Sequence, residues 1–168
     1  MLASYLHFER ILDMKLHFYQ PEFAQHIETY TLTDEQLLFT GIPKDSIEFS
    51  QAEDNHYPIL ALDNDQMVTF FALHTCKGVE PYSTNANAIL IRTFSTDFHH
   101  QRKGYAKQAL ALIPAFVAEH FVGINEIVLA VNIKNDVAQA LYAKCGFVDN
   151  GVRTMGHRGE LIVLSYYL

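Results

Sequence analysis

The sequence has 168 residues, of which 49% are hydrophobic and 18% are charged, and its formal net charge at pH 7 is −7. This composition is typical of a globular protein with a sizeable core and argues against an intrinsically disordered chain. The acidic balance disfavours a nucleic-acid partner, because a negative surface repels phosphates. The two cysteines, Cys76 and Cys145, lie far apart and show no metal-ligand spacing, so we expect neither a disulfide framework nor a zinc module, which is compatible with a cytoplasmic location.

The N-terminal residues 1–13 show no clear periodicity, and Met14 offers a second start. We therefore expect a single domain, 1–168, in which residues 1–13 form an extension outside the core. Glu9, Arg10 and other early charges argue against a signal peptide. The longest apolar run has about half the length of a membrane span. We expect a cytoplasmic protein with no membrane partner.

Hydrophobic spacing predicts a strand and two short helices at the start of the folded chain. The strand is predicted at 14–18, and apolar residues at helical spacing predict a helix at 23–30. Thr33 begins a capping-box sequence that is typical of the start of a second helix, and Gly41 and Pro43 are expected to end it.

The rest of the chain is predicted to alternate strands with two longer helices. A turn-forming sequence joins the first two strands into an antiparallel hairpin, and Pro114 is expected to bend the first of the two helices. This order is typical of an α/β or α+β domain. The strands are predicted at 57–62, 67–76, 88–94, 126–133, 147–152 and 161–168, and the helices at 103–121 and 137–145.

A candidate anion site lies between the strand at 88–94 and the helix that follows it. It consists of Gln101, Arg102, Lys103, Gly104, Tyr105 and Ala106. Gly104 allows the backbone to approach a ligand closely, and the first amides of a helix have no partner within the helix. The helix dipole and the two basic residues would suit a pyrophosphate. The pattern is neither the P-loop nor the dinucleotide-binding fingerprint.

A second informative stretch, 135–147, has the pattern Asn-x-x-Ala-x-x-Leu-Tyr-x-x-x-Gly-Phe. Together with Gln-x-x-Gly-x-Ala at 101–106, it resembles the GNAT superfamily of N-acetyltransferases. The resemblance covers residues 88–168 well and the rest only in the order of elements. It implies a mixed, mostly antiparallel central sheet of six to seven strands flanked by helices. It also implies that the strands at 88–94 and 126–133 splay apart and leave a cleft for CoA.

The resemblance further implies acetyl-CoA as the cosubstrate and assigns residues to it. The pyrophosphate would bind at 101–106, and Asn135 and Ala138 would contact CoA. Main-chain groups near Phe94 and Ser95 would bind the pantetheine arm as an added strand.

Tyr142 would be the general acid that protonates the departing thiolate. A phenol within hydrogen-bond reach can stabilise a thiolate whose pKa is about 8 to 9. The alternative role for Tyr142 is that of a core aromatic residue beside Phe147. Cys145 could be proposed as an acyl-carrying nucleophile, but we reject it because the C-terminal end of a helix raises the pKa of a thiol.

The expected acceptor is a primary amine that attacks the thioester directly in a ternary complex, after losing a proton to a base. Residues 1–100 hold 5 Lys and Arg against 14 Asp and Glu, which would steer a small cationic amine. The stretches 94–97 and 156–160 also resemble family members that acetylate polyamines. The acidic residues in the expected acceptor region are Asp34, Glu35, Asp45, Glu48, Glu53 and Asp54.

Several alternatives stay open at the level of sequence. The acceptor could be a protein N-terminus or lysine, the acyl group could be larger, or the protein could be a non-catalytic CoA-binding sensor. No metal is expected, since the adjacent histidines 99 and 100 would point apart on a strand. The strand at 161–168 is the candidate surface for a homodimer. The candidates for the general base are Asp97, Glu80, His74, His99 and His100.

Overall fold

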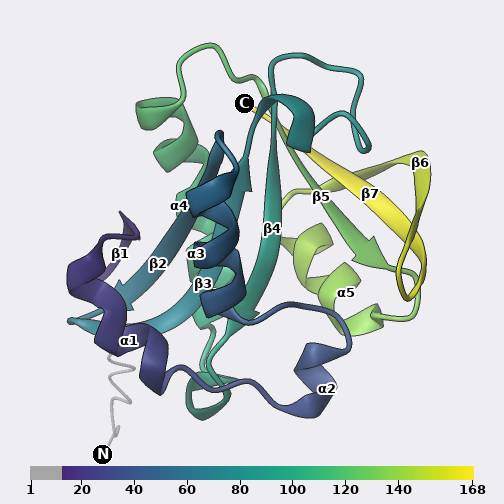
Figure 1. Ribbon diagram of the computed structural model, residues 1–168. Helices are drawn as coiled ribbons and strands as arrows, with labels where there is room; N and C mark the ends of the chain where they lie inside the picture. Colours follow the sequence, from purple (N-terminus) through teal and green to yellow (C-terminus); the bar gives the residue numbers. More distant parts are fainter. Residues whose placement is uncertain (1–12) are drawn as a thin grey trace, which may run out of the picture.

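The computed structural model describes residues 13–168, whose centre is a seven-stranded mixed sheet (Figure 1). The strand order is β1-β2-β3-β4-β5-β7-β6. Only the pair β4–β5 is parallel among the neighbouring strands of this sheet. The strands are β1 (Met14–Phe18), β2 (His56–Asp63), β3 (Gln66–His74), β4 (Ala88–Thr96), β5 (Glu126–Asn132), β6 (Val148–Gly156) and β7 (Gly159–Tyr167). The predicted mixed, mostly antiparallel sheet is therefore confirmed, while the extension predicted at 1–13 lies, apart from its last residue, outside the described residues.

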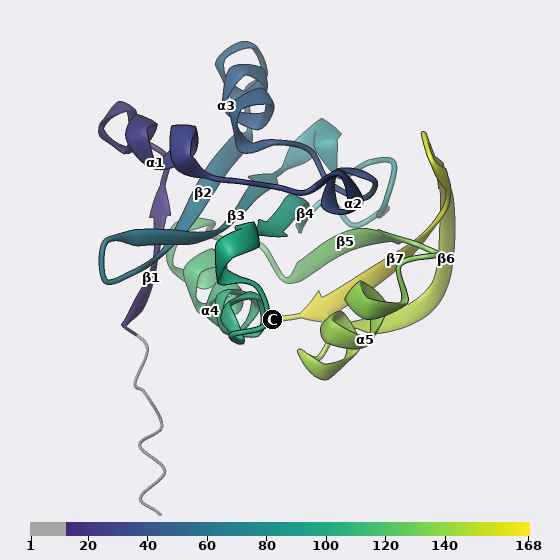
Figure 2. The ribbon, with the colours of Figure 1, turned by 90° about the horizontal axis from the view of Figure 1, so that it is seen from below.

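Helices cover both faces of the sheet, as Figure 2 shows: α4 and α5 lie on one face, and α1, α2 and α3 lie on the other. Apolar side chains of α4 and α5, such as Ile113 and Tyr142, join Ile59, Phe71 and Ile89 of the sheet in the largest core cluster. The α-helices are α1 (Ala24–Thr29), α2 (Asp34–Leu37), α3 (Pro43–Ala52), α4 (Tyr105–His120) and α5 (Asp136–Lys144). Short 3-10 turns are η1 (Pro21–Phe23), η2 (Cys76–Gly78) and η3 (Phe98–His100).

The parallel strands β4 and β5 separate about halfway along β4. Their last paired residues are Ile91 and Leu129, although β4 runs on to Thr96 and β5 to Asn132. Figure 1 shows β5 diverging from β4 beyond this point. The expected splay is therefore present, and it leaves the β5-facing edge of β4 without its partner strand.

A β-bulge occurs in β4 just after the two strands separate. The register between β3 and β4 shifts between Phe70 and Ala72, and Thr93 has a φ of +51°, in the left-handed region. A bulge adds one residue to one strand and so re-aims the side chains that follow. Phe94 accordingly packs with the α4 and α5 cluster, as Ile91 does.

The helix expected after Thr33 does end before Gly41 and Pro43, since α2 stops at Leu37, but a further helix, α3, begins at Pro43 and was not predicted. A proline at the first helical position lacks only an N–H that would have no partner there. Two expectations about local structure are wrong. Histidines 99 and 100 lie in η3 and not on a strand. The strand at 161–168 is no free edge, because β7 pairs with β5 on one side and with β6 on the other.

The helices of residues 13–168 include none with the length and apolar character that crossing a membrane would require. Pro114 lies inside α4, which continues past it from Tyr105 to His120.

Candidate active site

The turn before α4 is exposed to the solvent. Residues 101–104 are exposed, and both Arg102 and Gly104 have positive φ angles, of +61° and +81°. The first helical bond joins the N–H of Gln108 to the carbonyl oxygen of Gly104 over 3.1 Å. The amides of Ala106 and Lys107 therefore have no acceptor in the helix. With Arg102 and Lys103 beside it, this helix start has the charge and the free donors to bind a pyrophosphate.

Tyr105 and Ala106 can take part in such a site through their backbone. The Tyr105 side chain is only 6% exposed, and its hydroxyl donates to Asp63 Oδ2 over 2.8 Å. It therefore points into the protein, between α4 and the sheet, and not toward a ligand at the turn. Ala106 is half-buried and has no side chain that would obstruct an approaching phosphate.

The second sequence motif spans α5, and its end lies near the start of α4. Asn135 caps α5, since its Oδ1 accepts from the Ala138 N–H over 3.2 Å, and its side-chain NH₂ group is left to donate. The charge of Lys107, in the first turn of α4, acts on the pKa of Cys145 at the end of α5. The start of α4 and the end of α5, far apart in sequence, are therefore near each other in the fold.

Tyr142 lies at the gap between β4 and β5. Its ring is 9% exposed, and its centroid is 6.3 Å from that of Phe94, which follows the last β4–β5 pair, and 6.0 Å from that of Phe147. Its hydroxyl makes no hydrogen bond with another residue of the range 13–168. Burial raises the pKa of Tyr142 well above its usual range. The residue is therefore a neutral O–H donor at physiological pH, whose hydroxyl is not engaged elsewhere.

The thiol of Cys145 is not suited to act as a nucleophile. Burial raises its pKa, and this outweighs the opposing effect of Lys107. The sequence also predicted a raised pKa for this thiol, but from the helix end, whereas burial is the leading cause in the structure. Cys145 remains a thiol at neutral pH and a weak nucleophile.

Phe94 and Ser95 lie beyond the bulge but differ in what they can offer a ligand. Ser95 is buried, and its carbonyl oxygen and hydroxyl both hydrogen-bond with the hydroxyl of Tyr30, over 2.8 and 2.9 Å. Its polar groups are thus used to hold α1 onto β4. Phe94 lies next to Tyr142 and faces the α4 and α5 side of the gap.

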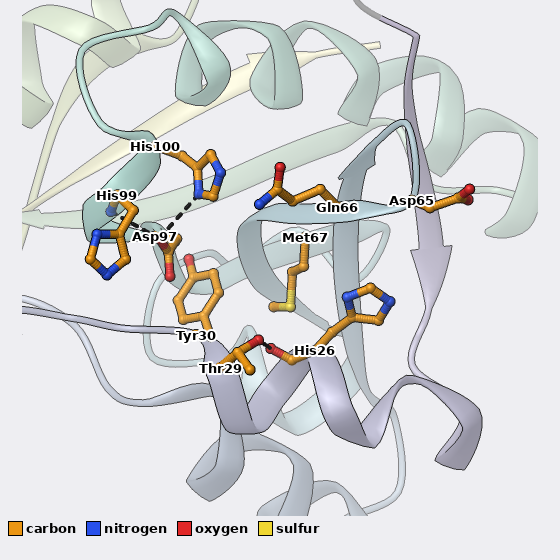
Figure 3. A pocket seen from close by; sticks show the side chains of 9 residues that line it. All are labelled: His26, Thr29, Tyr30, Asp65, Gln66, Met67, Asp97, His99 and His100. Atoms are coloured by element: carbon orange, nitrogen blue, oxygen red, sulfur yellow. Dashed lines mark hydrogen bonds and ion pairs between the residues drawn. The ribbon is translucent and has the colours of Figure 1, made fainter.

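A half-open pocket of about 540 Å³ lies between α1, the β2–β3 turn and η3. Figure 3 shows three of the candidate bases, Asp97, His99 and His100, at one side of it. It is lined by His26, Thr29, Tyr30, Asp65, Gln66, Met67, Asp97, His99 and His100.

Asp97 serves mainly to tie this region together. Its carboxylate accepts from the N–H of Thr31 over 2.7 Å, from the N–H of His99 over 2.9 Å and from Nδ1 of His100 over 3.1 Å (Figure 3). The side chain is buried. Because three donors already occupy its oxygens, Asp97 is a poor candidate for the base and a good anchor for the segment between α1 and α2.

The remaining candidates for the base lie elsewhere. Glu80 is exposed in the loop before β4. His74 is buried at the end of β3, where its Nδ1 hydrogen-bonds with Arg92 over 3.0 Å. Its ring packs against that of His56, with 5.2 Å between centroids. Both histidines lie on the α3 face of the sheet, beside Phe49.

The buried histidines predict a loss of stability in mild acid. Burial is the main cause that lowers the pKa of His56 to about 4, with smaller contributions from His74 and Arg92. An unfolded histidine titrates near pH 6.5. Between about pH 6.5 and about pH 4 the unfolded state is therefore protonated at this residue, whereas folded His56 is mostly neutral. The free energy of unfolding should therefore fall as pH drops through this window. We expect His56→Phe to flatten that fall in urea unfolding curves measured between about pH 7.5 and about pH 5. The exposed His157→Gln is the control, and an unchanged pH slope in His56→Phe would contradict the assignment.

Two residues of this region were missed by reasoning from sequence. In the sequence, Tyr30 is an ordinary apolar residue at helical spacing. No local pattern predicts its contact with Ser95, which is 65 positions away. Arg92 carried a signal that could have been used: it is the only charge in the otherwise buried strand sequence at 88–94. A charge inside a buried strand is uncommon and often functional.

Comparisons with known proteins show the family to which the chain belongs. The model of the acetyltransferase (GNAT) family matches residues 17–147. The uncharacterized N-acetyltransferase YbbJ of Bacillus subtilis (strain 168) is 40% identical over 157 residues, which are 93% of this chain and 98% of that protein. The chain therefore belongs to the acetyltransferase (GNAT) family.

Solved structures share the fold at low sequence identity. AAC(6')-Ib in complex with paromomycin and acetyl-CoA has a TM-score of 0.75 and 12% identity, with 92% of this chain and 93% of that chain covered. The spermidine N-acetyltransferase of Vibrio cholerae, in complex with CoA and spermine, has a TM-score of 0.67 and 13% identity, with 92% and 95% covered.

Proposed function

We propose that this N-acetyltransferase transfers the acetyl group of acetyl-CoA to the primary amine of a small molecule, by direct attack in a ternary complex. The observation that carries the proposal is that three features meet on the α4 and α5 side of the sheet. They are the amides in the first turn of α4, the unpaired edge of β4 beyond Ile91 and the hydroxyl of Tyr142. Together they offer sites for the pyrophosphate, the pantetheine arm and the sulfur of one extended thioester.

Each of these features has a defined task in the transfer. The amides after Gly104, with Arg102 and Lys103, hold the pyrophosphate, and the free edge of β4 takes the pantetheine amides. The acceptor amine approaches from the α1 to α3 side, since α4 and α5 cover the other face. It attacks the carbonyl carbon, the carbon–sulfur bond breaks, and the Tyr142 hydroxyl donates its proton to the sulfur. The proton lost by the amine leaves through water, and the Tyr142 phenolate regains a proton from water.

The acceptor is proposed to be small, and two findings support this. Paromomycin and spermine, in the two structures that share the fold, are small molecules that carry amines. The exposed carboxylates of α2 and α3 would attract an ammonium group of such an acceptor, as predicted for a polyamine or other cationic amine. They are Asp34, Glu35, Asp45 and Glu48.

A panel of amines tests the proposal. The purified protein is incubated with acetyl-CoA and, in turn, polyamines, aminoglycosides, amino acids and a lysine-containing peptide, and the release of CoA thiol is measured. We expect amine-dependent release with at least one small molecule. Binding of acetyl-CoA without release for any amine would favour the sensor, and release with the peptide alone would favour a protein acetyltransferase.

A further inference from the structure

Arg92 is the first residue of β4 after its last pair with β5, and its side chain lies on the face from which the acceptor approaches. Along β4, Ile89 and Ile91 face α4 and α5, whereas Leu90 packs in a different cluster. Arg92 alternates with Ile91 and contacts α3, since its guanidinium carbon lies 5.7 Å from the ring centroid of Phe49. Arg92 and Tyr142 therefore flank the gap between β4 and β5 from opposite faces of the sheet.

The guanidinium of Arg92 is held in place but lacks an opposite charge. It hydrogen-bonds with Nδ1 of His74 over 3.0 Å and packs on Phe49. The lowered pKa of His74 keeps that imidazole neutral at physiological pH, and burial is the main cause. Glu53 is near enough to act on the pKa of His74, yet within residues 13–168 Arg92 makes no ion pair.

A half-buried arginine without a carboxylate is costly, and buried charges are usually paired. A guanidinium has five N–H donors in one plane, and the only partner of these donors within 13–168 is His74. The fork that remains matches the two oxygens of a carboxylate, which it can bind with two parallel hydrogen bonds. Arg92 lies at the gap on the face from which the acceptor approaches. An anion bound by its guanidinium would therefore be part of the acceptor.

We propose that Arg92 binds a carboxylate of the acceptor, so that the acceptor is a small molecule that carries both a primary amine and a carboxylate, as an amino acid does. This inference rests on the proposed function and narrows it. It disfavours polyamines, whose charges are all positive and which Arg92 would repel at the gap. The acidic residues of α2 and α3 are compatible with it, because they can still attract the ammonium group of such a molecule.

The test uses pairs of amines that differ only in a carboxylate: lysine against cadaverine, and phenylalanine against phenethylamine. The values of kcat/KM are compared for the full-length protein, Arg92→Gln and Arg92→Lys. In the unchanged protein we expect the amino acid of at least one pair to be preferred about tenfold or more. Arg92→Gln should abolish the preference and leave the partner without a carboxylate at least as reactive. Arg92→Lys should keep part of it, since the charge remains and the fork is lost.

Lys44→Gln is the matched control, because it removes an exposed positive charge from α3 on the same side of the sheet. It should keep the preference. The melting temperature and the affinity for acetyl-CoA of each variant show that the fold and the donor site are intact. A preference that survives in Arg92→Gln, or its absence from the unchanged protein, would overturn the proposal.

The outcomes separate this proposal from the proposed function. Acetylation of other amines but of neither amino acid would refute the role of Arg92 and leave the activity standing. Without turnover of any amine, the activity fails, and carboxylate binding is then read by saturation-transfer NMR with hexanoate. A hexanoate signal that is present in the unchanged protein and in Lys44→Gln but lost in Arg92→Gln would support the site, and a signal that Arg92→Gln retains would refute it.

Discussion

Replacement of Tyr142 with phenylalanine is expected to lower kcat by about 100-fold or more, because a positioned general acid contributes about that much. The affinity for acetyl-CoA should hardly change. The ring remains, so its contacts with Phe94 and Phe147 remain too. The hydroxyl has no hydrogen-bond partner within residues 13–168, so its removal should leave the free energy of unfolding almost unchanged. Steady-state kinetics with the best acceptor, together with calorimetric titration of acetyl-CoA, measures both quantities.

Tyr166→Phe is the matched control for this variant. Tyr166 is a half-buried tyrosine that packs on the other side of Phe147, with 5.6 Å between the ring centroids. Both substitutions remove one hydroxyl from the same aromatic group, but only Tyr142 lies beside Phe94 at the gap. Equal rates for the two variants would show that Tyr142 is a core aromatic residue, the alternative that the sequence left open.

Sequence patterns predicted most of the elements because their signals are local. The capping box that begins at Thr33 is present, with both of its hydrogen bonds to Gln36. The hairpin of β2 and β3 turns between Asp63 and Gln66, where the turn-forming sequence predicted it. The two motifs identified the family because each has fixed spacing: the first places a glycine just before a helix, and the second runs from the start of a helix to the glycine that follows it. The start of α3 was missed, since Pro43 is compatible both with the end of one helix and with the start of the next.

The direction of individual side chains was the harder part. Tyr105 and Tyr142 both lie in motif stretches, yet the first donates to Asp63 at the end of β2 and the second lies at the gap. The difference depends on how α4 and α5 rotate against the sheet, which no short stretch of sequence encodes. The contacts of Tyr30 with Ser95 and of Thr31 with Asp97 join residues more than 60 positions apart for the same reason.

Charge bears on the acceptor in two ways, through the composition of the chain and through single residues. The count of acidic residues in the first 100 positions favours a cationic acceptor, but most of these carboxylates are exposed and act through screened, long-range fields. A single guanidinium at the gap acts at contact distance and in partial burial, where one charge counts for more. If Arg92 binds the acceptor as proposed, we expect it to weigh more than the net charge in the choice of acceptor.

Replacement of Gly104 with alanine should weaken the binding of acetyl-CoA by about tenfold or more, because a Cβ would stand where the backbone approaches a phosphate. In the free protein this Cβ would meet no atom within 4 Å, so the variant can fold. Its φ of +81° is unfavourable for alanine, and we expect a loss of about 1 kcal/mol in the free energy of unfolding. The value of kcat at saturating acetyl-CoA should stay close to that of the unchanged protein.

Gly151→Ala separates the two consequences of adding that methyl group. Gly151 lies in β6, has a φ of +85° and likewise has no atom within 4 Å of an added Cβ. Both variants should therefore lose similar stability in calorimetric unfolding, because the backbone strain is the same. Only Gly104→Ala should raise the dissociation constant for acetyl-CoA. If the two variants bind acetyl-CoA equally well, the turn before α4 does not hold the pyrophosphate, and the donor must bind elsewhere.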